Sequence, residues 1–532
     1  MKRLLHIRRA IALLALLLCT QAEAQSDVLT AGEILGRPTD TSVSLKATAA
    51  MELEVYVEYS TSSGNYSRRT SRSWYEAGEQ IEITIDGLEP DKLYYYRIRH
   101  RRTPTSGFKS LDEGTFHTQR LPGSSFSFAV QADSHLQQYI DNDKPMNVDL
   151  YHVNLKNISD RKPDFMIDLG DTFWMNNAEG YDDFLAVYQK QRDFLQPVLR
   201  SIPMFFVLGN HEDECGWLLD GTEESRGVLG TKARKLMFMN PVPDGFYSGN
   251  SKKYEFVDLR ENYYAWEWGN ALFVVLDPYW HTDLNPNVTG DSWDWTLGSA
   301  QYEWLTDTLE SSGAVFKFIF AHQVTGGTIP YGRGGVEAAS HELGSHGSYE
   351  WGGENEDGSW GFDTKRPGWE MPVHDLMVKH DVSIFFHGHD HIFVYQELDG
   401  VVYQAVPQPC DSSYGMGKYD LAFYEYGDAV ENSGYLLITV HEDETTVEYI
   451  RAFLPPDETE DQINGESGYT YEVFPPESGL EDDAGADSEM DAGTDSGSGT
   501  VPEEAGVVAD ASTNDSLERA AGGCKCSFIG AG

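Results

Sequence analysis

Polar and apolar residues alternate along several short segments in the first part of the chain. Residues 52–59 and 80–85 change from polar to apolar at nearly every second position. This period is typical of strands that bury one face. The pattern therefore predicts a small all-β domain, which we place at residues 27–119.

The pattern changes after Ser124, where apolar strands alternate with amphipathic segments as far as about Pro455. Apolar residues recur at helical spacing in three segments, and continuous apolar runs predict the strands. The expected helices are 148–158, 181–199 and 299–309, and the expected strands are 125–131, 163–169, 203–208, 271–276, 315–320 and 383–386. Such alternation predicts an α/β layered domain, placed at 122–455, with its site at the strand ends.

The interval 324–372 stands apart within this domain. It is rich in Gly, His and Trp and shows little periodicity. It is also longer than a simple connection between two elements. We expect it to form a lid or the wall of a pocket.

Side chains that commonly bind metals follow the predicted strands. They are Asp133 and His135, Asp171, Asn210, His322, and His389 with His391. The last two lie two positions apart, so extended backbone would point them the same way. The set offers oxygen and nitrogen ligands without a thiolate, which suits two hard or borderline metal ions. Asp171, directly after Gly170, is the candidate to bridge the two ions.

The composition limits the classes of partner. The chain has 532 residues, with 86 Asp and Glu against 39 Lys and Arg, for a formal net charge of −47. No basic excess is present to neutralise phosphates, which argues against a nucleic-acid platform. Hydrophobic content of 40% with 12 Trp is ample for sizeable cores. Spacing alone leaves open whether Cys215 and Cys410 pair.

The two ends of the chain have their own compositions. Residues 1–24 hold basic residues, an apolar run and a small-x-small site, which predicts a cleaved signal peptide and a secreted, periplasmic or cell-surface protein. No other run approaches the length of a transmembrane helix. Residues 477–518 carry 13 acidic residues and no basic one, as in a disordered linker. Residues 520–532, with Cys524 and Cys526, resemble the start of a C-terminal sorting tag, which implies attachment to the cell surface.

The motifs at the strand ends resemble the calcineurin-like metallophosphoesterase superfamily over about 330 residues. They are Asp-x-His at 133–135, Gly-Asp at 170–171, Gly-Asn-His-Glu at 209–212, the later His322, and Gly-His-x-His at 388–391. The resemblance implies a four-layer α/β/β/α sandwich. It places one metal on Asp133, His135, Asp171 and His391, and a second on Asp171, Asn210, His322 and His389.

The same resemblance gives roles around the substrate. His211 would sit beside the phosphate as proton donor, next to Asn210. Glu212 or Asp213 would hold His211 in its productive tautomer and raise its pKa. Arg333 either donates a guanidinium fork to a phosphate oxygen or is a solvated loop arginine.

The N-terminal domain has a resemblance of its own. Residues 88–98, with Tyr94 as a corner tyrosine and Phe116 on the last strand, resemble a fibronectin type III domain. It would serve as a spacer or as a sugar- or protein-binding module. This order of domains resembles purple acid phosphatases and the alkaline phosphatase D group. Purple acid phosphatases have a metal-binding tyrosine where this chain has Trp174, and His135 supplies a ligand instead.

These features predict an exported phosphoester hydrolase with two metal ions, Fe, Zn or Mn. It would act as a phosphomonoesterase on a small-molecule substrate. The ions would generate a bridging hydroxide and clamp the phosphate, while His211 protonates the leaving group. The alternatives are a phosphodiesterase or nucleotidase using the same site and, from another class, a non-catalytic surface adhesion protein.

Overall fold

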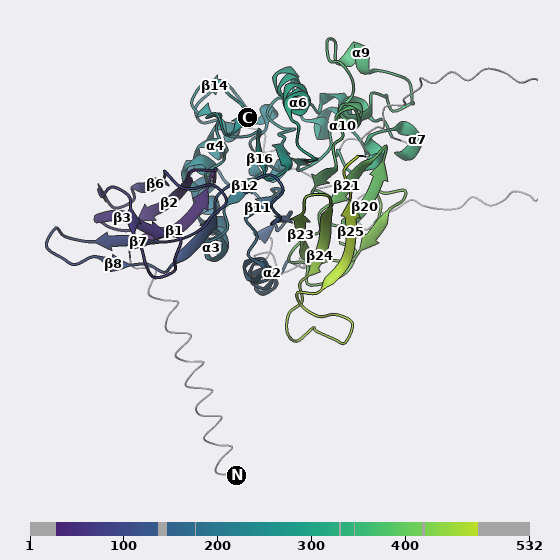
Figure 1. The fold of residues 1–532 in the computed structure, drawn as a ribbon. Coiled ribbons are helices and arrows are strands. Elements are labelled where there is room, and N and C mark those ends of the chain that lie inside the picture. The colour runs from purple at the N-terminus through teal and green to yellow at the C-terminus, as the bar shows by residue number, and fades with distance from the viewer. Residues whose placement is uncertain are drawn as a thin grey trace, which may run out of the picture. The chain divides into compact units, whose positions relative to one another are not determined.

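The computed structural model describes residues 28–136, 146–175, 177–328, 331–344, 346–417 and 421–476 (Figure 1). These residues belong to one unit that ends at Pro476. The predicted signal peptide 1–24 and the C-terminal segments 477–518 and 520–532 lie outside them.

The N-terminal domain is a sandwich of two antiparallel sheets, with the orders β1–β2–β6 and β4–β3–β7–β8, where β5 pairs with β3 and β9 with β7. The strands are Leu29–Gly36 (β1), Val43–Ala49 (β2), Leu53–Ser60 (β3), Arg68–Arg69 (β4), Ser73–Tyr75 (β5), Gln80–Ile85 (β6), Leu93–Arg101 (β7), Lys109–Ser110 (β8) and Gly114–His117 (β9). Val55, Val57 and Tyr59 point into the core between the sheets, as alternation predicts. The prediction of an all-β domain is confirmed.

The corner of this domain has the expected contact. The hydroxyl of Tyr94 accepts a hydrogen bond from the backbone N–H of Glu89 at 3.0 Å. Phe116 lies on β9 and stacks on Tyr94, with ring centroids 5.5 Å apart. The assignment to the fibronectin type III class stays a prediction.

The second domain contains two larger sheets. The first has the order β12–β11–β10–β23–β24–β25, in which β10, β11 and β12 are parallel. Its strands are Phe126–Gln131 (β10), Phe165–Asp168 (β11), Met204–Phe206 (β12), Gly434–Val440 (β23), Thr445–Arg451 (β24) and Ser467–Val473 (β25). The parallel strands are mostly apolar because both of their faces are covered.

The second sheet has the order β13–β16–β17–β18–β19–β21–β20–β22, and β17, β18, β19 and β21 are parallel. Its strands are Ser248–Gly249 (β13), Tyr264–Trp268 (β16), Ala271–Val275 (β17), Phe316–Ala321 (β18), Ile384–His387 (β19), Phe393–Leu398 (β20), Val401–Ala405 (β21) and Asp428–Val430 (β22). A small hairpin pairs Lys253–Tyr254 (β14) with Asp258–Leu259 (β15).

The two sheets face each other across an aromatic core and are covered by helices on their outer faces. Phe128 and Phe165 of the first sheet meet Phe273 of the second in that core. The outer helices are Val148–Arg161 (α2), Tyr181–Leu199 (α3) and Arg226–Met237 (α4) on the first sheet, and Ser299–Ser311 (α6) and Val373–Lys379 (α10) on the second. The predicted four-layer α/β/β/α sandwich is confirmed.

The interval predicted to form a lid or wall contains single-turn helices. They are Val336–Ala338 (η6), His341–Gly344 (α7), Tyr349–Gly352 (α8) and Phe362–Lys365 (α9). The remaining short helices are Asn210–Glu212 (η3), Gly216–Leu218 (η4), Pro286–Thr289 (α5) and Ser292–Asp294 (η5). One turn is too short to produce a helical period in a sequence, which explains the lack of pattern.

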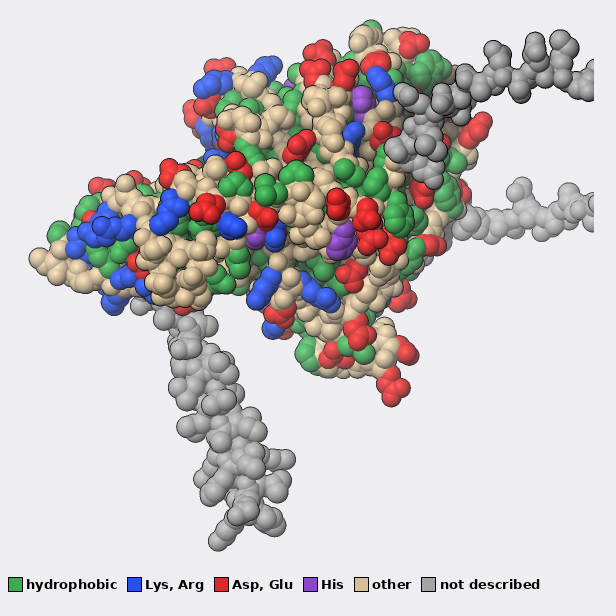
Figure 2. Space-filling view, in the orientation of Figure 1, with side chains coloured by type: hydrophobic (Ala, Val, Ile, Leu, Met, Phe, Trp, Pro, Cys, Tyr) green, Lys and Arg blue, Asp and Glu red, His purple; other side chains and the backbone are tan. Residues whose placement is uncertain are grey.

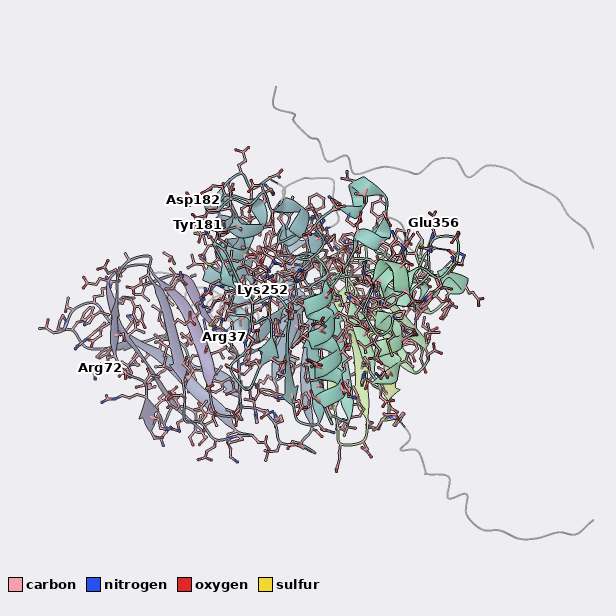
Figure 3. The ribbon with its side chains drawn as sticks, turned by 90° about the horizontal axis from the view of Figure 1, so that it is seen from above. Arg37, Arg72, Tyr181, Asp182, Lys252 and Glu356 are labelled. Atoms are coloured by element: carbon pink, nitrogen blue, oxygen red, sulfur yellow. The ribbon has the colours of Figure 1, made fainter. Side chains whose placement is uncertain are left out.

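Contacts between the two domains centre on α3 and α4. Arg192 of α3 is buried, and its guanidinium donates to the carbonyls of Gly32 and Lys46 in the β domain. Arg37, where the domains meet in Figure 3, donates to the carbonyl of Asn240 at 2.7 Å. Backbone carbonyls thus accept charged donors across the boundary.

Two further expectations can be compared with the described residues. None of the helices among them combines the length and apolarity needed to span a bilayer. Cys215 and Cys410 are both buried and both free. The pairing that spacing left open is therefore not formed.

Candidate metal centre

The carboxyl ends of five strands deliver the predicted ligands to one place. Asp133 and His135 follow β10, Asp171 follows β11, Asn210 follows β12, His322 follows β18, and His389 and His391 follow β19. All but Asn210, which is partly exposed, are buried. Parallel strands end at the same edge of their sheet, so side chains from distant parts of the sequence converge.

Asp133, His135 and His391 form one group. Nε2 of His391 lies 3.4 Å from Oδ1 of Asp133, and Nε2 of His135 lies 3.6 Å from the same oxygen. The two Nε2 atoms are 3.0 Å apart. These three side chains direct one ligand atom each at a common point.

Asp171, His322 and His389 form a second group, in which the ligand atoms lie within 4.8 Å of one another. Nε2 of His322 is 3.1 Å from Oδ2 of Asp171. The same Oδ2 is 3.8 Å from Nε2 of His135, which belongs to the first group. Asp171 therefore lies between the two groups, the position that a bridging carboxylate requires.

Each carboxylate uses one oxygen to brace the site and turns the other toward the histidines. Oδ2 of Asp133 accepts the backbone N–H of His389 at 2.9 Å, and Oδ1 of Asp171 accepts the backbone N–H of His211 at 2.8 Å. Loops from different strands are tied together by these bonds. The ligand positions are thereby fixed by the backbone.

The two histidines of the second group are oriented through their other ring nitrogens. Nδ1 of His322 donates to the carbonyl of Leu169 at 2.7 Å, and Nε2 of His389 donates to the carbonyl of Tyr331 at 2.9 Å. A carbonyl acceptor on one nitrogen leaves the lone pair of the other for a metal.

Several buried polar atoms find no hydrogen-bond acceptor or donor within the described part of the chain. They include Oδ1 of Asn210, Oδ1 of Asp133 and Nε2 of His322. Buried polar groups are normally satisfied, so a cluster of such atoms at strand ends is typical of a ligand-binding site. The donor set of oxygens and imidazole nitrogens fits two divalent or trivalent metal ions.

The backbone around the site adopts conformations that side chains other than glycine rarely take. Asp133, His135, Asp171, His389 and His391 all have φ between 42° and 69°. Such strain is retained where surrounding contacts fix it, and it clusters at functional sites. A Cβ at Gly388 would lie 2.7 Å from Oδ2 of Asp133, so glycine is needed there for the close approach.

Charged neighbours within the site shift the pKa values of its carboxylates and histidines. Burial acts to raise the pKa of Asp133, but His391 and His322 outweigh it and hold that pKa well below its usual range. Burial acts to lower the pKa of His322, yet Asp171 and Asp133 raise it to about 10. The buried carboxylates stay ionised, so the centre attracts positive charge.

His211 lies at the side of the centre. Its Nε2 is 3.8 Å from Oδ2 of Asp171, and its ring stacks on Trp174 with centroids 4.8 Å apart. The N–H of Met175 donates to the carbonyl of His211 at 3.1 Å. Both the backbone and the ring of His211 are thus held in place. Trp174, known from the sequence only as a departure from a family motif, supplies the stacking surface.

The expected support of His211 by the next two residues is wrong. The carboxylate of Glu212 accepts the backbone N–H groups of Gly209 at 2.7 Å and Asp171 at 3.1 Å, under the ligand loops. Asp213 pairs with Arg226. The expected rise in the pKa of His211 is also not found, because burial lowers that pKa to about 3.

Arg333 reaches the centre from the interval 324–372. Its guanidinium bonds to the carbonyl of His389 and lies 3.0 Å from Oδ1 of Asp390. Oδ2 of Asp390 accepts the N–H of Gly334 at 3.0 Å and the hydroxyl of Tyr424 at 2.7 Å. This part of the interval is a wall beside the ligand loop. Donation from Arg333 to a phosphate stays a prediction.

Three other titratable side chains, which are not among the predicted ligands, have partners of their own. Asp277, at the end of β17, accepts the side-chain N–H of Asn262 at 2.7 Å and lies 3.6 Å from Arg260. His374 bonds to Tyr403. Nδ1 of His341 lies 3.0 Å from the carbonyl of His346.

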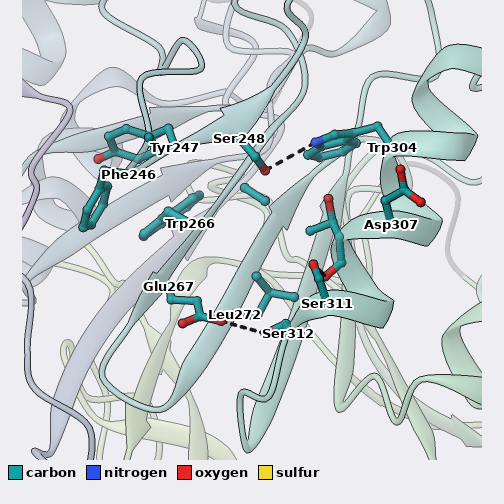
Figure 4. Close-up of a pocket in the computed structure, with 13 residues that line it drawn as sticks. Phe246, Tyr247, Ser248, Trp266, Glu267, Leu272, Trp304, Asp307, Ser311 and Ser312 are labelled. Carbon is teal, nitrogen blue, oxygen red and sulfur yellow. Dashed lines mark hydrogen bonds between the residues drawn. The ribbon is translucent and has the colours of Figure 1, made fainter.

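A cavity of about 450 Å³ also lies away from the centre (Figure 4). It is lined by Trp266 of β16, Leu272 near the start of β17, and Trp304 of α6. The ligand loops follow the opposite ends of the parallel strands.

Comparisons with known proteins agree with this architecture. A family model described as calcineurin-like phosphoesterase matches residues 126–393. Purple acid phosphatase 23 of Arabidopsis thaliana is 23% identical over 253 residues, which are 44% of this chain and 45% of that protein. The chain thus spans about half the length of this curated relative.

Two solved structures share the fold. One is titled the structure of PhoD, with a TM-score of 0.56 and 17% identity over 80% of this chain and 86% of that one. The other is purple acid phosphatase PPD1 from yellow lupin (Lupinus luteus) seeds, also with a TM-score of 0.56 and 17% identity, over 84% of this chain and 75% of that one. Identities this low speak for the fold alone.

Proposed function

This chain belongs to the calcineurin-like phosphoesterase family, and from that premise we propose that it is an exported phosphomonoesterase with a binuclear metal centre. Its proposed ligands are Asp133, His135, Asp171 and His391 for one ion, and Asp171, Asn210, His322 and His389 for the other. The substrate is a small phosphoester.

One observation carries this proposal. Side chains from four separate strand ends place ligand atoms in two adjoining groups that share the neighbourhood of Asp171. Buried oxygen and nitrogen atoms in both groups lack hydrogen-bond partners among the described residues. A purely structural cluster has no reason to leave its polar atoms unsatisfied.

When bound, two metal ions supply a nucleophile at neutral pH and neutralise phosphate charge. The protein holds the ligand side chains in position. Asp133 and Asp171 give the centre its negative charge, and their second oxygens hold the loops of His389 and His211. The carbonyls of Leu169 and Tyr331 fix the tautomers of the ligand histidines.

His211 is the proposed proton donor to the leaving alcohol. Its ring is held by Trp174, with Nε2 beside Asp171 at the edge of the centre. The pKa of the ring is low in the protein by itself because the site is buried. A bound phosphate dianion favours the protonated ring, since an opposite charge stabilises the imidazolium.

The choice of a monoester rests on similarity. The curated relative and one structural relative are named purple acid phosphatases. The test is metal analysis of the purified protein together with turnover of a monoester and a diester of nitrophenol. We expect two metal ions per chain, faster turnover of the monoester, loss of turnover on chelation and recovery with added metal.

Faster turnover of the diester would move the assignment to a phosphodiesterase or nucleotidase on the same centre. Full turnover after complete removal of metal would contradict the proposal as a whole.

A further inference from the structure

The outer face of the β3–β7 sheet carries cations that the metal centre does not use. Tyr96 and Ile98 of β7 point into the sandwich core, so Arg97, Arg99 and Arg101 lie on the opposite face. Figure 2 shows Lys and Arg side chains gathered over these N-terminal strands. We define the arginine face by six residues: Arg69, Arg72, Trp74, Arg97, Arg99 and Arg101.

The three arginines of β7 share two carboxylates of the neighbouring strand. Arg99 lies 2.8 Å from Glu58, which also pairs with Arg97, and Arg101 pairs with Glu54. These ion pairs cross between β3 and β7, where Glu58 is in register with Arg97 and Glu54 with Arg101, while Arg99 lies diagonally to Glu58. They leave one formal positive charge in excess on β7 for an external ligand.

Arg69 and Arg72 differ from them. Arg69 lies opposite Glu58 on the other side of β3, and both arginines are exposed. Neither has an ion-pair partner in the described part of the chain. The uncompensated charge of the face is therefore concentrated at the edge formed by β4 and β5.

Aromatic rings lie beside these two cations. The guanidinium of Arg72 sits over Tyr56 and Phe108, at 5.4 and 4.9 Å from the ring centroids. Trp74 lies opposite Glu54 on the same face and is 41% exposed. A cavity of about 280 Å³ on this domain is lined by Tyr56, Glu58, Tyr66, Ser67, Arg68 and Arg69.

We propose that the arginine face binds an acidic polysaccharide. Guanidinium forks of Arg69 and Arg72 match carboxylate groups, and the exposed ring of Trp74 offers a flat apolar surface to a sugar ring. Glu54 and Glu58, opposite Trp74 and Arg69, are four residues apart on β3, so the face spans roughly 13 Å. That length suits a stretch of polymer better than a single ion.

The amount of free charge argues for a sparsely charged polymer. Proteins that bind duplex DNA commonly neutralise about 6–10 phosphates, whereas this face offers only Arg69, Arg72 and one excess charge on β7. The formal charge of −47 on the whole chain would also repel a dense polyanion. A uronate polymer satisfies both limits.

The position of the face leaves the metal centre accessible. Figure 3 shows Arg72 on the side of the β domain away from Arg37, which contacts the second domain. A polymer held there would keep the phosphoesterase at a polysaccharide surface without covering its site.

The test is binding of the full chain to polygalacturonate, with dextran as the neutral polymer and duplex DNA and polyphosphate as dense polyanions. We expect binding of polygalacturonate that weakens with salt, and none of dextran. The double variant Arg69→Gln/Arg72→Gln should raise Kd by about tenfold or more, since it removes charge-assisted hydrogen bonds. Trp74→Ala should weaken binding of polygalacturonate as well.

Lys156→Gln/Lys253→Gln is the matched control, because it removes two exposed charges from the second domain. All variants should keep wild-type melting temperature and turnover of nitrophenyl phosphate. The proposal is overturned if polygalacturonate does not bind at low salt, or if the double variant and the control bind it equally. Tighter binding of DNA or polyphosphate than of polygalacturonate also overturns it, in favour of a dense polyanion.

Discussion

The side chain of Asn210 presents a buried amide oxygen that has no hydrogen-bond partner in the described residues. We expect Asn210→Ala to lose metal at the second position and to lower kcat/KM at least about 100-fold. The fold should remain, because the removed group makes no contact that holds the loop. Metal content, kcat/KM and melting temperature are measured on the same preparation.

Asn157→Ala is the control for this variant. Asn157 lies on α2, away from the centre, and its side chain bonds to Asn464 at 2.8 Å. It should keep its metal and its turnover. If Asn210→Ala retains two metal ions and full turnover, the proposed ligand set is wrong.

His211 allows proton donation to be separated from metal binding. His211→Ala should keep both ions, because the proposed ligands do not include its ring, and should lower kcat/KM by about 10²–10⁴-fold for an alkyl phosphate. The loss should be smaller for nitrophenyl phosphate, whose leaving group departs as an anion without a proton. Comparing kcat/KM for the two esters decides the matter.

Equal losses for both esters would assign His211 to binding. One of its ring nitrogens also lies within 4.8 Å of ligand atoms of His135 and Asp171, so release of metal from the variant would assign it to the centre itself.

The residues that gather at the strand ends were predictable one by one, whereas the surroundings of His211 were not. Asp133, His135 and His391 follow apolar runs in short motifs, and a strand end leaves little freedom in where such side chains go. Glu212 is different because its neighbours in space come from another loop. The N–H of Asp171 meets its carboxylate across 41 residues of sequence, and no local pattern records that contact.

Loops, rather than strands, complete the wall of the centre. Asp390 bonds to Arg333, Gly334 and Tyr424, so it joins two remote loops to the turn that carries His389. Asp390→Asn should weaken metal binding by about 10–100-fold, the usual effect of losing a group that orients a ligand. Turnover should fall at limiting metal and recover with excess metal. Metal titrations of activity measure both effects.

Tyr424→Phe removes one of these bonds and should show a smaller effect in the same direction. The control is Asp399→Asn, whose side chain is 64% exposed and pairs with His374. Identical metal affinity in Asp390→Asn and the control would show that the loops do not position His389.

Long helices, whose apolar residues repeat over several turns, were predicted well, and single-turn helices were not. The helix 181–199 has the predicted bounds, and α2 and α6 extend three and two residues beyond the predicted 158 and 309. Their apolar stripes extend over three turns or more. The single-turn helices α7, α8 and α9 carry no such stripe, and tertiary contacts decide their conformation.

The two domains share buried polar contacts, which makes their stabilities interdependent. Lys46 of the β domain donates to the carbonyl of Lys235 at 2.9 Å, and Tyr96 donates to the carbonyl of Arg200 at 2.7 Å. Sequence patterns locate each domain but give no sign of these bonds, since the partners are more than a hundred residues apart. A boundary held by bonds to backbone carbonyls leaves little trace in side-chain patterns.

Arg192 is the strongest test of that interdependence. Its guanidinium is fully buried and donates to Gly32, Lys46 and Met237, all through backbone carbonyls. Arg192→Met keeps the length of the side chain but leaves the three carbonyls without this donor. We expect the free energy of unfolding to fall by about 3 kcal/mol or more, because each buried unsatisfied polar group is costly.

Calorimetry measures the change in the free energy of unfolding. The number of unfolding transitions also shows whether the two domains unfold together, which the midpoint alone does not. The wild type should unfold in one transition, because neither domain can unfold without breaking the hydrogen bonds to backbone carbonyls that join it to the other. Arg192→Met should melt lower and show the two domains separating. Arg161→Met removes the same group from the surface of α2, where the exposed Arg161 donates to the carbonyl of Gly465 at 2.9 Å, and it should melt as the wild type does. An unchanged midpoint and a single transition in Arg192→Met would mean that apolar contacts alone hold the domains together.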